Sequence, residues 1–317
     1  MNRKAKYNEF CEKQYVPLMM RPFWMDAVCG ADGWEVCLAT DQGGEVTGSL
    51  VYHVARYRGF PIIKMPPLTD YSGLWFNYPK NLEKNNSKYT FEKEVCNELL
   101  NQLPKIAFFY QQWHPAITNW LPFFWNGFRQ TTHYTYQLSL KDEPTLLENI
   151  NKTIRKNLRK LKELITIEIV EDVNQLYHLV NLSFARQHLA PPYTLELLRE
   201  LDKSLKNKNL RRIYLARDQA GQYHAGVYLI WDEQCAYSLI SAGDPVLRQS
   251  RATYLIQWQT FLDSIGKVKT FDLCGSILEP VEESLRAFGG ELVPHFKITK
   301  AQNKLFQLAG ILLNKDV

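Results

Sequence analysis

Cysteine is scarce in this sequence, and the few cysteines lie far apart. The 317 residues contain six of them, none in a CxxC pair: Cys11, Cys29, Cys37, Cys96, Cys235 and Cys274. Disulfide frameworks and structural zinc sites need clustered or regularly spaced cysteines, so the sequence argues against both. Thiols scattered through apolar segments are typical of small core residues. We therefore expect free cysteines and a reducing compartment.

Long apolar runs are also missing. No stretch approaches the roughly 18 apolar residues of a membrane-spanning helix, and LAGILL near the end is far shorter. The first residues, MNRKAKYNEFCEKQ, are charged where a secretory signal peptide needs an apolar segment. These features predict a cytoplasmic protein with no integral membrane span, and they leave a peripheral membrane contact open.

Several motifs of catalysis and nucleotide binding do not occur. The sequence contains no GxxxxGK[ST], no strand-linked GxGxxG, no HExxH and no GxSxG. The common P-loop, dinucleotide, zinc-hydrolase and serine-hydrolase sites are therefore not supported. The seven histidines stand singly, which favours packed or surface histidines, and we expect no metal cofactor.

Apolar and aromatic residues, in contrast, are plentiful. Hydrophobic residues make up 45% and aromatic residues 13% of the chain, enough for two packed domains. The formal net charge of +5 is compatible with anionic partners but does not by itself indicate nucleic acid.

The first part of the chain, residues 1–143, predicts a mixed α and β domain. Helix is expected over 7–30, interrupted by Pro17 and Pro22, and again over 88–103. Strand-like runs flank the Gly-Gly turn DQGGE and recur in IAFFYQQW and HYTYQLSL. Residues 59–81, rich in proline and aromatics, are interpreted as a structured loop.

The second part, residues 144–317, opens on the clearest helix pattern. Apolar residues recur at helical spacing over 145–165, and the remaining surface is rich in lysine and arginine. From Arg211 onward the patterns predict strand, strand, strand, helix, strand, helix and strand. The fold class is therefore α+β, and we place the domain junction before or within the 145–165 helix.

This order resembles the core of GNAT acyltransferases. The segments TIRKNLRKLKELITIEIV, SFARQHLAPPYTLELLREL, GDPVLRQSRATYLIQWQTFLDSIG, FDLCGS and FGGELVPHFKI resemble the branch of Fem-type aminoacyltransferases and related two-domain N-acyltransferases. MPPLTDYSGLWF and LPFFWNGFRQTTHYTYQLSL in the first part are similar to it as well. The resemblance implies two tandem GNAT-like domains, each a mixed central sheet flanked by helices.

In such enzymes an amine attacks an activated acyl carbon. The resemblance implies that backbone N–H groups bind the carbonyl oxygen where two strands splay apart, here CAYSLISAG and VKTFDLCGS. It also implies that the phosphates of CoA lie at the start of the following helix. The residues at this donor-binding position are Arg248, Arg251, Ala252 and Thr253.

The match at this loop is partial. The family pattern is R/Q-x-x-G-x-G/A, and Arg248 fits its first position, whereas Arg251 and Thr253 replace the glycines. Glycine allows close backbone approach there. The alternative interpretation is an exposed basic helix start without a bound donor.

The reaction centre and the acceptor site are assigned in the same way. Asp272 and Tyr237 would flank the reaction, although a strand-end aspartate can also cap a turn. The predicted acceptor-binding residues are Arg155, Arg159, Arg186, Tyr193, Ser276 and Arg286. The basic residues among them also fit a solvated face. In LRAFGG, Leu285 stands where the family has lysine, and the paired glycines also fit a helix end.

The sequence thus predicts an N-acyltransferase or aminoacyltransferase. Acyl-CoA is the favoured donor and aminoacyl-tRNA the other, and the acceptor is an amine of a small molecule or of a cell-envelope (cell-wall) precursor. The competing hypothesis is a non-catalytic GNAT-fold protein that binds an anionic metabolite.

Overall fold

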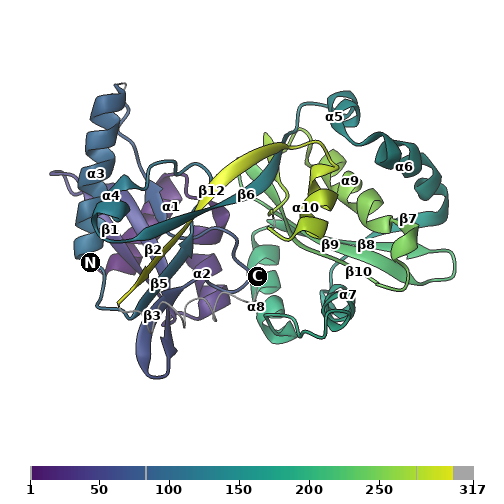
Figure 1. Cartoon of the computed structure of the whole chain (residues 1–317), viewed down its shortest axis with the longest axis horizontal. Coiled ribbons are helices and arrows are strands. Elements are labelled where there is room, and N and C mark those ends of the chain that lie inside the picture. Colours follow the sequence, from purple (N-terminus) through teal and green to yellow (C-terminus); the bar gives the residue numbers. More distant parts are fainter. Residues whose placement is uncertain (1, 83, 276, 303–317) are drawn as a thin grey trace. The chain divides into compact units, whose positions relative to one another are not determined.

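The computed structural model describes residues 2–82, 84–275 and 277–302 (Figure 1). The chain forms two compact units. Unit 1 contains the residues up to His133 and those from Pro294 onward, and unit 2 runs from Tyr134 to Val293. The expected division after residue 143 therefore differs from the observed one by ten residues, and the chain also returns to unit 1 near its end.

Unit 1 is a mixed sheet with helices. Its elements, with the two strands β6 and β12 in which the chain passes between the units, are α1 (Arg3–Lys13), η1 (Leu18–Met20), α2 (Pro22–Cys29), β1 (Trp34–Thr40), β2 (Val46–Tyr57), β3 (Phe60–Lys64), β4 (Leu74–Phe76), α3 (Asn85–Asn101), β5 (Phe108–Gln112), α4 (Leu121–Trp125), β6 (Arg129–Ser139) and β12 (Glu291–Ala301). The strand order is β1-β2-β3-β5-β12, and β4 pairs with β2.

Two parts of unit 1 depart from the expected pattern. The segment 59–81, interpreted as a loop, contains β3 and β4, and β3 pairs with both β2 and β5. The last strand, β12, pairs antiparallel with β5 over Lys297–Ala301, which is why the end of the chain belongs to unit 1. Strand pairing between distant segments leaves no local mark in a sequence.

Unit 2 follows the predicted order of elements. They are α5 (Glu143–Asn149), α6 (Lys152–Leu164), β7 (Ile165–Val170), α7 (Asn174–Ala185), α8 (Leu195–Asn207), β8 (Arg211–Asp218), β9 (Tyr223–Trp231), β10 (Cys235–Gly243), η2 (Arg248–Ser250), α9 (Ala252–Ser264), β11 (Thr270–Asp272) and α10 (Glu279–Arg286). The strand order is β6-β11-β10-β9-β8-β7, with β10 and β11 parallel.

Helices cover both faces of this sheet (Figure 1). Helix α9 packs on β8, β9 and β10, and its Leu255 and Phe261 share a core with Val227. Helix α7 packs on the opposite face, where a Cβ on Gly226 would come within 2.7 Å of Leu176. Glycine at this position lets α7 approach the strand closely.

The helix expected over 145–165 is in fact two helices. Ile150 and Asn151 have extended backbone conformations (ψ 145° and 133°), and the side chain of Asn151 accepts a hydrogen bond from the N–H of Thr153 as the N-cap of α6. Asn151 N–H also donates to the carbonyl of Ala287. The apolar spacing continues through the break, because both helices pack on the same core, so periodicity alone could not reveal it.

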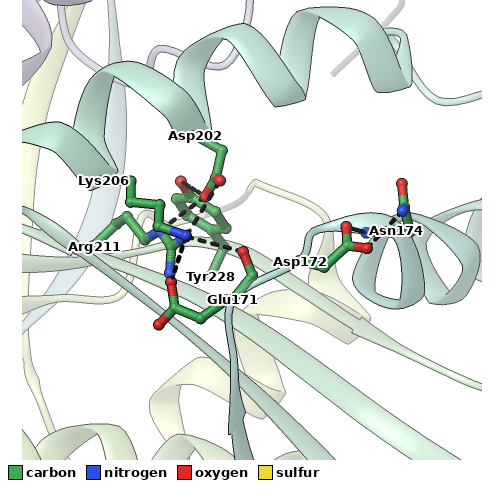
Figure 2. A network of polar contacts seen from close by, with 7 residues as sticks. All are labelled: Glu171, Asp172, Asn174, Asp202, Lys206, Arg211 and Tyr228. Atoms are coloured by element: carbon green, nitrogen blue, oxygen red, sulfur yellow. Dashed lines mark hydrogen bonds and ion pairs between the residues drawn. The ribbon is translucent and has the colours of Figure 1, made fainter.

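A polar network holds α8 against the sheet (Figure 2). The buried guanidinium of Arg211 on β8 lies 2.9 Å from Asp202 on α8, and Tyr228 on β9 donates to the same carboxylate at 2.8 Å. Arg211 also donates to the backbone carbonyl of Glu171 at 3.0 Å. Burial, and after it the nearby Asp202 carboxylate, raises the pKa of Tyr228 above its usual range.

Two general expectations can be compared with the described residues. All six cysteines are free, and burial raises the pKa of Cys11 and Cys29 to about 12, so these two thiols are unreactive. Within the described ranges, the helices are too short or too polar to cross a bilayer.

Candidate functional site

Strands β10 and β11 of unit 2 separate after a short parallel pairing. The paired residues run from Cys235 with Thr270 to Tyr237 with Asp272, while β10 continues to Gly243. Beyond Tyr237, that edge of β10 has no strand partner among the described residues. This is the splayed arrangement that the sequence predicted, and it leaves backbone groups available to a ligand.

A bulge and a buried polar chain shape β10 at this point. The register with β9 shifts between Ser238 and Ile240, which increases the local twist of the strand. Below it, Ser238 donates to Gln257 of α9 at 2.9 Å, and Gln257 donates to Thr260 at 3.0 Å. These contacts join the middle of β10 to the middle of α9.

The loop between β10 and α9 borders a small cavity of about 170 Å³, here called the loop cavity. Ser183 of α7 and Gly243 of β10 both line it, and the Ser183 hydroxyl donates a hydrogen bond to the carbonyl of Gly243 at 2.8 Å. The side chains of Arg186 and Arg248 also line it, and both are exposed and form no ion pair among the residues that the structure describes. Ala252 and Thr253, the first residues of α9, complete the wall.

Electrostatics at the loop cavity favour an anion. A helix N-terminus presents free N–H groups and the positive end of its dipole. Two arginines without carboxylate partners add positive charge, and Arg can bind phosphate or carboxylate through two parallel hydrogen bonds. Asp244, the acid at the same cavity, accepts the backbone N–H of Val246 at 2.7 Å.

Arg251 takes the backbone conformation that the family's glycine would favour. Its φ and ψ are 57° and 24°, in the left-handed region. An L-residue other than glycine adopts this region at a cost of about 1–2 kcal/mol. The replacement of glycine therefore does not prevent the loop from reaching the start of α9.

The same loop borders a second and larger cavity of about 580 Å³, here called the α6 cavity. His224 at the start of β9 lines both cavities and connects their walls. Its Nδ1 lies 2.8 Å from Ser250 Oγ, and its Nε2 lies 3.0 Å from Asp218 Oδ2. Arg251 lines the α6 cavity, whereas Arg248 lines the loop cavity. The two arginines predicted to bind the donor thus line different cavities.

The predicted reaction residues lie at the point where the strands part. Tyr237 and Asp272 are the last residue pair of the β10–β11 ladder, but their side chains are 1% and 0% exposed. Asp272 accepts hydrogen bonds from Thr135 at 2.6 Å and Gln137 at 2.9 Å, both on β6. The carboxylate of Asp272 on β11 is therefore hydrogen-bonded to β6 at the point where β10 and β11 separate.

The predicted acceptor residues are spread over unit 2. Arg155 and Arg159 are exposed on α6, and Arg155 donates to the carbonyl of Leu147 at 3.2 Å. The carbonyl of Tyr193 accepts from Tyr177 at 3.0 Å, and burial raises the pKa of Tyr193 above its usual range. Arg286 is paired with Glu282 at 3.1 Å. Only Arg186 lines the loop cavity with Arg248, and Ser276 lies outside the described residues.

Sequence reasoning missed His224, Asp218 and Ser183. Each of them contacts the loop or its neighbouring strand end, yet they are separated along the chain and belong to no motif. Only the pairing of β8 with β9 and the packing of α7 bring them together. As for metals, no group of three His, Cys, Asp or Glu side chains in the described ranges is arranged to hold an ion.

A family model described as an acetyltransferase (GNAT) domain matches residues 148–280, which lie within unit 2. Unit 2 contains a GNAT acyltransferase domain. The elements of this GNAT domain that border the loop cavity, β10 and α9, lie inside the matched segment.

Solved structures extend the likeness over the whole chain. The crystal structure of FemX is similar over 96% of this chain and 98% of that chain, with a TM-score of 0.67 and 14% identity. The C-terminal domain of a putative lysylphosphatidylglycerol synthetase from Agrobacterium fabrum is similar over 98% and 94%, with a TM-score of 0.55 and 13% identity. A tandem GNAT protein from the clavulanic acid biosynthesis pathway is similar over 95% and 94%, with a TM-score of 0.51 and 12% identity.

These likenesses concern the fold, because all three identities are low. The predicted superfamily and fold, a mixed α and β protein of tandem GNAT-like domains with Fem-like architecture, are confirmed. The predicted class of enzyme, an acyltransferase, is confirmed with them. A comparison with curated protein sequences gives no significant match.

Proposed function

We propose that the protein transfers an acyl group from acyl-CoA to an amine. The loop cavity carries this proposal, because it combines an anion-favouring helix start, Arg186 and Arg248 at the end of the splayed strands. A phosphate of the donor would bind at Arg248 and the N–H group of Thr253, while the N–H of Ala252 donates to Ser250 at 3.3 Å and Ala252 supplies the cavity wall. The thioester would then extend along the free edge of β10.

The chemistry follows from this placement. The amine nitrogen attacks the thioester carbon, a C–N bond forms, the C–S bond breaks, and the sulfur leaves as thiol after proton transfer from the nitrogen. Backbone N–H groups of β10 after Tyr237 would stabilise the oxygen that becomes negative in the transition state. We propose Asp272 as a positioning residue, since its carboxylate is occupied by β6, and Tyr237 as the polar group beside the reacting carbon.

The acceptor is proposed to be an amine of a small molecule or of a cell-envelope precursor. Arg155 and Arg159 supply exposed positive charge on unit 2 for an anionic acceptor. Arg286, which is paired with Glu282, is a further candidate together with Tyr193 and Ser276. A cytoplasmic location is proposed with it, because the six cysteines are free thiols.

Aminoacyl-tRNA is the competing donor. The structural likeness to FemX and to the domain of a putative lysylphosphatidylglycerol synthetase favours it. The modest charge of +5 favours CoA, since binding to nucleic acid depends strongly on neutralising phosphates. The hypothesis of a non-catalytic binding protein is weaker than it was from the sequence alone. Arg251 keeps the left-handed backbone conformation that the family's glycine would favour.

A transfer assay with two donor arms tests the proposal. Release of free CoA thiol is measured from acetyl-CoA and longer acyl-CoAs with amine-bearing metabolites and peptidoglycan precursors, and transfer of a labelled amino acid from charged tRNA is measured in parallel. Thiol release that depends on the amine supports the proposal. Transfer from tRNA alone would contradict the donor, and silence in both arms would contradict the proposed activity.

A further inference from the structure

The α6 cavity adjoins the loop cavity and shares His224 and Ser250 with it, whereas its other lining residues do not line the loop cavity. It is bounded by α6, the turn between β8 and β9, and the loop before α9, and its volume of about 580 Å³ is in the usual range for small-molecule sites. Its residues all belong to unit 2. The proposed donor position at Arg248 does not use it.

One side of the α6 cavity is apolar. Leu161, Leu164 and Ile165, from the end of α6 and the start of β7, line it together with Ala220 of the turn. Leu164 is 51% exposed although it is a large aliphatic side chain. An apolar group bound here would remove this surface from water, at roughly 25 cal/mol for each Å² buried.

Positive charge lines the cavity as well. Lys160 of α6 and Arg251 of the loop both line it, and neither forms an ion pair among the described residues. The acid at this cavity, Asp218, is already engaged by His224 and by the backbone N–H of Gln222 at 2.9 Å. The hydrogen bond from His224 holds the pKa of Asp218 below its usual value. Lys160 and Arg251 are therefore available to a bound anion.

The backbone of Arg251 is a second, independent observation. Glycine would adopt its left-handed conformation without strain, yet the position carries a cation that lines the cavity. Strained backbone held by surrounding structure is typical of functional sites. The residue at this strained position is thus a cation that lines the α6 cavity.

We propose that the α6 cavity is a second ligand site, which binds a small molecule carrying a phosphate or carboxylate on an apolar body. The anion lies between Lys160 and Arg251, and the apolar body covers Leu161, Leu164 and Ile165. The amides of Asn157, Gln219 and Gln249 offer further hydrogen bonds at the rim. This site is distinct from the donor site and does not depend on the proposed reaction.

Calorimetric titration with phenyl phosphate tests the site, with benzoate as the carboxylate probe and inorganic phosphate and phenol as the two halves of the ligand. We expect saturable binding of phenyl phosphate or benzoate, and binding at least about tenfold weaker for inorganic phosphate and for phenol. Comparing the first two probes distinguishes a phosphate from a carboxylate ligand.

Three variants locate the binding. Lys160→Ala and Arg251→Gly should each weaken phenyl phosphate binding about tenfold, and Leu164→Asp should abolish it. Arg251→Gly relieves the backbone strain, so this variant separates loss of charge from misfolding. Thermal unfolding of each variant verifies that it is folded.

Two control variants complete the design. Lys156→Ala removes an exposed lysine of α6 outside the cavity, and Arg248→Ala alters only the loop cavity. Both should bind phenyl phosphate like the unaltered protein, whatever happens to CoA. No saturable binding, binding that is lost in Arg248→Ala but kept in Lys160→Ala, or inorganic phosphate binding as tightly as phenyl phosphate would each overturn the proposal.

Discussion

At the scale of single residues, the stretch LRAFGG shows how a family-like motif can be mainly structural. Gly289 has a φ of +77°, and a Cβ there would lie 2.2 Å from the carbonyl oxygen of Asn149 at the end of α5. The position is occupied by glycine because of both its backbone conformation and this close approach. The replacement of the family's lysine by Leu285 is a separate feature of this stretch.

Gly289→Ala should therefore lower the free energy of unfolding by more than 2 kcal/mol or so, since strain and a clash add. Gly221→Ala is the matched control, because Gly221 has a similar φ of +86° with open space around its Cα. The control should cost only about 1 kcal/mol. Urea denaturation measures both, and equal losses would mean that the contact with Asn149 is unimportant.

Histidine burial in unit 1 gives a second residue-scale prediction. Burial, with repulsion from His133 and His114 added, lowers the pKa of His295 to about 4, and burial lowers that of His114 to about 4. A histidine whose folded pKa is depressed stabilises the fold above its unfolded pKa of about 6.5, and this stability is lost as pH falls towards 4. The unfolded chain binds the extra protons in that window.

The free energy of unfolding should thus fall by about 1.4 kcal/mol per pH unit for each such histidine between pH 6 and pH 4.5. His295→Phe should remove one histidine's share of this slope, because the Nδ1 of His295 has no hydrogen-bond partner among the described residues. Denaturation at several pH values gives the slopes, and an unaltered slope in His295→Phe would refute the assignment.

At the scale of elements, the polar network in Figure 2 joins α8 to β8 and β9 of the sheet. The side chain of Arg211 is 4% exposed and that of Asp202 13% exposed, so the charges depend on each other for compensation. Lys206, by contrast, pairs with Glu171 at the surface, where the two side chains are 52% and 68% exposed. The two ion pairs, although close together, should contribute very differently to stability.

Asp202→Asn should destabilise the protein by about 3–5 kcal/mol, because the buried Arg211 guanidinium then keeps only the exposed Glu171 carboxylate, at 3.3 Å, as a counter-charge. Lys206→Ala should change the free energy of unfolding by less than about 0.5 kcal/mol. Chemical denaturation of both variants gives the comparison. Similar losses in the two variants would show that burial of the Asp202–Arg211 pair does not set its contribution.

At the scale of the whole molecule, the sequence predicted the order of elements well and the long-range pairing poorly. The strands and helices of unit 2 followed from periodicity and turn residues, as the β8–β9 turn at Gly221 illustrates. The pairing of β12 with β5 and the break between α5 and α6 at Asn151 did not follow from these patterns. Both depend on partners that are distant in the chain. Arg248 was selected by its position in a motif, whereas His224 and Ser183 line the same cavity but lie far from it in the chain.

Binding of a CoA donor at the start of α9 can be measured by calorimetric titration of acetyl-CoA into the purified protein and two variants. We predict saturable binding that Arg248→Ala weakens about tenfold or more, because the arginine's charge meets a donor phosphate. Lys203→Ala, which removes an exposed lysine of α8, should bind acetyl-CoA unchanged. Absence of binding, or equal affinity in Arg248→Ala, would contradict the account.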